Sequence, residues 1–166
     1  MEANNQEEDI SEASIAKITP VYWFNNSKIY THNKSNHAII FCSKDPLPYD
    51  FTVKVRYNIL KSTPFQCIGL SHRFIDQENK SYLGDTATGE GTIGYGVSGY
   101  AGIEGKLTNV GGIMKVHDIL TIKGSGNNVE FLVNDAHIFS HVFANHHSFY
   151  LAANCLYEDE FEIIDY

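Results

Sequence analysis

Hydrophobic and polar residues alternate along residues 51–59 in the clearest pattern of the chain. Phe51, Val53, Val55, Tyr57 and Ile59 fill every second position, and polar residues stand between them. Successive side chains of a strand point to opposite faces, so this pattern predicts a strand with those five residues in a core. A helix would spread the same apolar residues around its circumference.

Shorter apolar stretches predict further strands, separated by turn residues. They cover residues 38–42, 65–70, 92–97, 119–123, 129–133, 149–155 and 161–164. Segment 124–128 contains only Gly, Ser and Asn and predicts a hairpin, because Gly and Asn tolerate a positive φ. No long stretch shows a helical period, so we expect an all-β domain built as a two-sheet sandwich or a barrel.

The chain has 166 residues, which fits a single folded domain. Residues 1–17 are acidic and polar and predict a flexible tail, so we expect the domain to cover residues 18–166. The formal net charge of −8 argues against a nucleic-acid surface and against docking on an anionic membrane. The N-terminus lacks the pattern of a signal peptide, and no apolar run is long enough for a membrane helix.

Three cysteines occur, Cys42, Cys67 and Cys155, and none forms a C-x-x-C pair. An odd number cannot pair completely within one chain. Their apolar neighbours predict buried free thiols, and buried free thiols favour a reducing, intracellular location.

Segments 89–94 and 94–99 both match the glycine pattern G-x-G-x-x-G. A dinucleotide site needs a helix after that loop, so that the helix N-terminus meets the pyrophosphate. The following residues 100–105 are too rich in glycine to begin a helix. Glycines within strands and bulges therefore explain the pattern better, and we expect no cofactor.

Histidines are frequent in the last third of the chain. His137 and His141 would share one face of a strand, and His146 or His147 would supply a third ligand for zinc or copper. The competing interpretation is a set of solvated loop histidines, because no Cys or carboxylate stands at a recognisable ligand spacing.

Acidic and amide side chains suggest two other kinds of site. Asp76, Glu78, Asn79 and Asp85 would serve a calcium-dependent lectin, although they lack the order of a calcium loop. Acidic residues 158–160 fall in an expected turn and show no pattern of paired strand carboxylates, which argues against a glycosidase. A carbohydrate-binding domain therefore stays open as the alternative function.

Four segments occur in the order found in SPRY domains. Residues 93–99 (IGYGVSG) resemble the central glycine-aromatic motif of that family, and residues 117–122 resemble its "G-D-x-hydrophobic" strand. Residues 129–135 resemble its "hydrophobic-x-F-x-x-N-G" hairpin, and residues 148–153 the strand before the last one. The resemblance covers residues 21–166. His117 and Asp135 stand where the family commonly has Gly, and Ala152 stands where it has Pro.

The resemblance implies a concanavalin A-like β-sandwich of two bent antiparallel sheets without catalytic activity. SPRY domains are protein-interaction modules whose loops bind a peptide or a folded partner, often in adaptors or larger assemblies. In this chain the corresponding loops are residues 22–26, 72–89, 98–105 and 141–147. The contact residues expected from these loops and their flanks are Arg73, Phe74, Tyr82, Tyr95 and Tyr100. The negative charge favours a basic or neutral partner.

Overall fold

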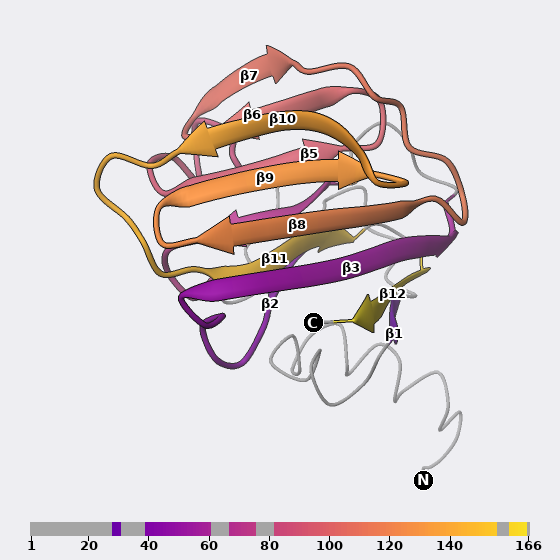
Figure 1. Cartoon of the computed structure of the whole chain (residues 1–166), viewed down its shortest axis with the longest axis horizontal. Helices are drawn as coiled ribbons and strands as arrows, with labels where there is room; N and C mark the ends of the chain where they lie inside the picture. The colour runs from indigo at the N-terminus through magenta and orange to yellow at the C-terminus, as the bar shows by residue number, and fades with distance from the viewer. Residues whose placement is uncertain (1–27, 31–38, 61–66, 76–81, 156–159, 166) are drawn as a thin grey trace, which may run out of the picture.

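Two antiparallel sheets of six strands each face one another in the computed structural model (Figure 1), which describes residues 28–30, 39–60, 67–75, 82–155 and 160–165. One sheet has the strand order β1-β12-β3-β8-β9-β10 and the other β2-β11-β4-β5-β6-β7. This is a β-sandwich, as the short strands and Gly- and Asn-rich turns predict. The strands are β1 (Lys28–Tyr30), β2 (Ile39–Cys42), β3 (Asp50–Ile59), β4 (Cys67–Ser71), β5 (Thr92–Gly96), β6 (Tyr100–Ile103), β7 (Lys106–Asn109), β8 (Ile119–Ser125), β9 (Asn128–Val133), β10 (Ala136–Val142), β11 (Tyr150–Cys155) and β12 (Glu160–Asp165).

The strand predicted at residues 51–59 is confirmed as β3, with Val53, Val55 and Tyr57 fully buried between the sheets. Phe51 is half-buried and packs against the core. Ile59 corrects the prediction, because it is 40% exposed at the end of the strand. The pairing with β12 is irregular at this point, because the register shifts between the Tyr57–Phe161 and Ile59–Glu160 pairs, and the core does not reach that far.

Aromatic side chains fill the space between the sheets. Phe131 on β9 stacks on Phe139 of β10, with ring centroids 4.6 Å apart, and Tyr95 of the opposite sheet lies 6.4 Å from Phe131. Tyr57 and Phe161 form an edge-to-face pair within the first sheet. Such rings bury a large apolar area each, which explains how a sandwich of short strands obtains a continuous core.

Two tight turns form where Gly, Asn and Asp residues stand in the sequence. Ser125 pairs with Asn128, so the predicted hairpin has a two-residue turn and its strands extend into segment 124–128. Between β9 and β10, Asn134 and Asp135 both adopt positive φ values of 50° and 69°. His117 has a φ of 74°. Both departures from glycine in the resemblance, Asp135 and His117, thus occupy left-handed positions where Gly is the usual residue.

Strands β1, β6, β7 and β10 were not predicted. Residues 98–105 were expected to form a binding loop, yet most of them belong to β6 and to the turn that joins it to β7. β6 contains only four residues, β7 is largely polar, and β10 carries His137 and His141. Three of these strands, β1, β7 and β10, lie at the edges of their sheets, where a strand exposes more of its side chains and the apolar pattern weakens.

The thiols of Cys42 and Cys67 are buried and free, as predicted. Burial raises the pKa of Cys42 to about 11 and that of Cys67 to about 12. The side chain of Cys155, the acidic tail 1–17 and loop 22–26 lie outside the described residues, so the division at residue 18 stays a prediction. None of the described segments forms a helix suited to crossing a membrane.

Candidate functional site

A row of small residues crosses the outer face of the second sheet. Strand pairing places Ala152, Gly69, Gly94 and Gly102 side by side on β11, β4, β5 and β6. A Cβ at Gly94 would lie 2.6 Å from the Leu83 carbonyl oxygen, and one at Gly102 would lie 2.7 Å from the carbonyl carbon of Gly84. The backbone at residues 83–84 therefore rests directly on the sheet, and only glycine allows this approach.

The loop is fixed to the sheet by a buried asparagine. Asn154 Oδ1 accepts a hydrogen bond from the Leu83 backbone N–H at 2.7 Å and another from the Cys67 thiol at 2.8 Å. Leu83 and Ile75 then pack over Cys42 and Ala152 in a small second core outside the sheet. Every one of these residues is buried, so packing and hydrogen bonds together hold residues 83–84 on the sheet.

The side chain of Asp85 holds the turn at residues 82–88 together by hydrogen bonds. Its carboxylate accepts backbone N–H groups from Tyr82 at 3.0 Å, Ala87 at 2.9 Å and Thr88 at 3.1 Å. The Thr88 hydroxyl accepts the Gly84 N–H at 2.8 Å, and the Arg73 guanidinium donates to the Thr88 carbonyl at 3.0 Å. Asp85, one of the four residues considered as calcium ligands, thus organises the turn, whereas Asp76, Glu78 and Asn79 lie outside the described residues.

A hollow of about 270 Å³ lies between this loop and the outer edge of the sheet; we call it the glycine groove. Gly94, Gly96 and Gly102 belong to its floor strands β5 and β6, where they present no side chains. On the other side stand Tyr100, which is 46% exposed, and Leu107, which is 75% exposed. The loop side is formed by Tyr82, Leu83, Asp85 and Thr86, and Cys67, Ser98 and Gly105 complete the lining.

Exposed Tyr and Leu side chains over a flat, rigid floor can bind an apolar side chain of a partner, because binding removes their surface from water. Tyr82 is half-buried, and burial, together with Cys67 and Asp85, raises the pKa of its phenol. The phenol therefore stays protonated near neutral pH.

Similarity to known proteins is found in the structure and not in the sequence as a whole. No protein-family model matches the sequence, and no curated protein matches it. The structure of a human SPRY domain aligns with 82% of this chain and 90% of its own, at a TM-score of 0.67 and 12% identity. The chain has the fold of a SPRY domain.

Two further solved structures agree with this SPRY fold. The TRIM65 PSpry domain aligns at a TM-score of 0.66 with 10% identity, over 84% of this chain and 82% of that one. The SPRY domain of human HERC1 aligns at 0.59 with 11% identity, over 76% of this chain and 81% of that one. At these identities the likeness concerns the fold, and it confirms the sandwich that the four sequence motifs implied.

The SPRY sandwich brings only two of the five predicted contact residues together. Tyr82 and Tyr100 both line the glycine groove. Arg73 instead donates to the Thr88 carbonyl, and Phe74 lies edge-to-face against Tyr150 with ring centroids 5.8 Å apart.

Tyr95 corrects the sequence prediction. It is 1% exposed and packs against Phe131 and Phe139 in the core, so it offers no surface to a partner. In the motif at residues 93–99, Tyr95 points inward because its neighbours Gly94 and Gly96 occupy the alternate, outward positions of β5. Gly94 and Gly96 of this motif therefore form part of the floor of the groove, and its tyrosine belongs to the core.

Leu107 is the groove residue that sequence reasoning missed. It lies on β7, joined to β6 by a turn at Glu104 and Gly105, whose φ values are 49° and 94°. The pair Glu-Gly between two short stretches was a usable hairpin signal. It was masked by the many glycines on either side.

The histidines lie in separate pairs. His137 contacts Ser140 at 2.8 Å, whereas His141 Nε2 lies 2.7 Å from Glu104 Oε2 and so links β10 to the other sheet. His146 stacks on His72 with ring centroids 4.1 Å apart. Within the described ranges, no three His, Cys, Asp or Glu side chains converge as metal ligands.

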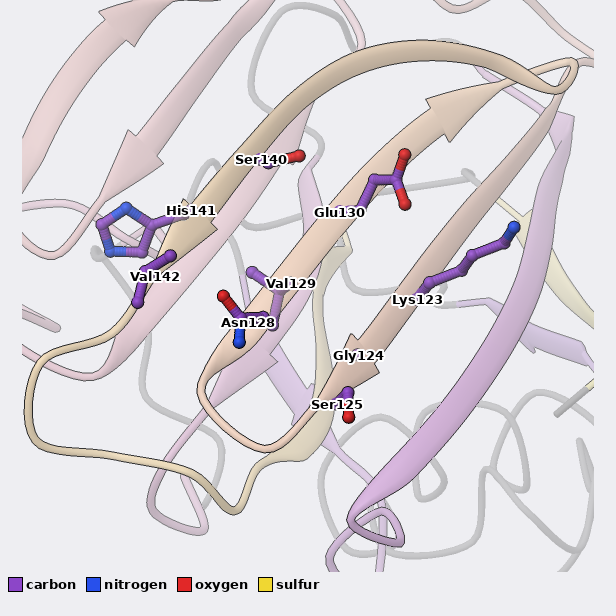
Figure 2. A pocket seen from close by; sticks show the side chains of 9 residues that line it. All are labelled: Lys123, Gly124, Ser125, Asn128, Val129, Glu130, Ser140, His141 and Val142. Atoms are coloured by element: carbon purple, nitrogen blue, oxygen red, sulfur yellow. The ribbon is translucent and has the colours of Figure 1, made fainter.

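A second hollow of about 320 Å³ lies on the outer face of strands β8–β10. Figure 2 shows Lys123, Glu130 and Ser140 on three neighbouring strands, where the pairing puts them in one row. Its other side chains are polar apart from those of Val129 and Val142. It offers no large aromatic side chain for an apolar contact, so the glycine groove is the stronger candidate.

Proposed function

We propose that this chain is a non-catalytic protein-interaction module that binds a peptide or protein partner at the glycine groove. The observation that carries the proposal is the groove itself, where exposed Tyr100 and Leu107 stand beside a floor of glycines. A loop fixed by Asn154 and Asp85 forms its opposite side, so the groove exists before a partner arrives. A preformed site loses little conformational entropy on binding, which favours recognition. The SPRY fold supports the same function.

The net charge and the free thiols indicate the kind of partner and the compartment that suit the proposed module. With a net charge of −8, the chain favours a basic or neutral partner, since like charges slow association. The buried free thiols of Cys42 and Cys67 suit a reducing, intracellular compartment. In such a setting the domain would act as an adaptor or as a subunit of a larger complex.

A random-peptide phage library selected on the full chain tests this proposal. Synthetic peptides of the enriched sequence are then titrated by fluorescence polarisation against the wild type, Tyr100→Ala and Leu107→Ala. An aromatic anchor is worth about 2 kcal/mol at a binding site, so Tyr100→Ala should weaken binding roughly 30-fold.

Two exposed residues outside the groove serve as matched controls. Tyr49 is 64% exposed and Val142 is 59% exposed, so Tyr49→Ala and Val142→Ala remove similar side chains elsewhere. These variants should bind within about twofold of the wild type, because surface changes away from a site have little effect. The proposal is rejected if no peptide is enriched, or if the groove variants bind as well as these controls.

A further inference from the structure

Among the described residues, no strand pairs with the outer edge of β7. This strand is the last of its sheet, and Lys106, Leu107 and Asn109 are all exposed. The Val110 N–H bonds to the Gly99 carbonyl at 2.9 Å, so even-numbered positions face β6. Because main-chain groups alternate in an antiparallel pair, Leu107 and Asn109 direct their N–H and C=O groups away from β6. Those groups form a template on which another strand can pair.

The neighbouring edge, β10, is less suitable for pairing. Its register shifts between His137 and Phe139, which marks a bulge. The segment after β7 also packs against it, since a Cβ at Gly112 would lie 2.5 Å from Ile138 Cδ1. Bulges and covering segments protect an edge from added strands. β7 shows no bulge, so it is the better template of the two.

The side chains of β7 indicate which segment would fit. Leu107 pairs with Gly102 on the outer face, so it belongs both to the open edge and to the glycine groove. A large apolar residue opposite Leu107 on an added strand would cover its exposed surface and extend toward the groove. Lys106 carries the single charge of β7 and forms no ion pair with the described residues, so an acidic residue opposite it is favoured.

We propose that β7 binds an extended segment of a partner protein as an added antiparallel strand, with a large apolar residue opposite Leu107 and an acidic residue opposite Lys106. This inference rests on the proposed function, because the same partner fills the glycine groove. It adds that main-chain hydrogen bonds to Leu107 and Asn109 hold the segment, while the groove selects its side chain. An acidic residue at that one position is compatible with a partner that is neutral or basic overall.

Amide hydrogen exchange on the full chain, measured by NMR with an enriched phage peptide, tests the main-chain contacts. The Leu107 and Asn109 amides should become protected on binding, whereas the Thr108 amide, which faces β6, should change little. Asn109→Pro removes one outward N–H, and Asn109→Ala keeps it. Losing one hydrogen bond should make Asn109→Pro bind about 3- to 10-fold more weakly, with Asn109→Ala close to the wild type.

A charge exchange tests the acidic position. Lys106→Glu should weaken binding by up to about fivefold, and a peptide with Lys in place of its acidic residue should restore it. Groove-dependent binding without protection of Leu107 and Asn109 overturns this inference and leaves the proposed function standing. Protection with no sensitivity to Tyr100→Ala supports the strand pairing and rejects the groove. Failure to enrich any peptide rejects both.

Discussion

Gly94→Ala tests whether the loop at residues 83–84 and the sheet form one rigid unit. The new Cβ would lie 2.6 Å from the Leu83 carbonyl oxygen, 3.0 Å from Leu83 Cβ and 3.1 Å from Cys67 Sγ. Ordinary contacts begin at 3.4 Å, so Leu83 must retreat by about 0.8 Å from its oxygen contact. A retreat of that size strains the 2.7 Å hydrogen bond from the Leu83 N–H to Asn154.

The magnitude follows from these two effects. Overpacking a buried position costs about 1–3 kcal/mol, and a buried N–H that loses its acceptor costs a similar amount. We expect the free energy of unfolding to fall by about 2–4 kcal/mol. For a domain of this size that corresponds to a melting temperature lower by roughly 5–15 °C, measured by differential scanning calorimetry with urea unfolding as a second method.

Gly111→Ala provides the control, because a Cβ at Gly111 meets nothing within 4 Å. Its φ of 76° makes alanine strained there, at a cost of about 1–2 kcal/mol, without any effect on the loop. Gly94 has no positive φ, so its penalty comes from packing alone. If Gly94→Ala lowers the free energy of unfolding by less than about 0.5 kcal/mol, the backbone at residues 83–84 is not packed on Gly94 and the reasoning is refuted.

Three other predictions concern the core, the thiols and a histidine. The Tyr95 hydroxyl is buried without a hydrogen-bond partner among the described residues, so Tyr95→Phe should leave the free energy of unfolding unchanged or raise it. Tyr95→Ala should lower it by about 3–5 kcal/mol, measured by urea unfolding. Cys42 and Cys67, with pKa values raised to about 11 and about 12, should resist alkylation at pH 8 until the chain is denatured; mass spectrometry showing labelling of the folded protein would contradict this. Burial, then His146 and Arg73, lower the pKa of His72 below its usual 6.5, so the folded state binds fewer protons and melting temperature should fall as the pH drops below 6.5. His72→Gln should flatten that slope, and an identical slope in the variant would exclude His72 as its source.

The amino-acid sequence by itself determined the fold class and most of the strands. Alternation at residues 51–59 holds for any strand with one face in a core, so β3 followed without tertiary information. The turn residues 126–127 and 134–135 reflect local backbone preferences, which are also readable from sequence. Three of the four edge strands, β1, β7 and β10, escaped this approach, whereas the edge strand β2 was predicted. β7, for example, is partly solvated, and its four residues lack a regular apolar pattern.

Only the tertiary structure decided which residues face a partner. Tyr95 and Tyr100 look alike in the sequence, but strand pairing turns the first into the core and the second toward the groove. Gly69, Gly94 and Gly102 become neighbours only through the register of β4, β5 and β6. The reason for glycine at Gly94 and Gly102 is the backbone at residues 83–84, which rests on them. Local backbone preferences set the conformation of each segment, whereas a binding site consists of residues that are distant in the sequence and adjacent only in the folded structure.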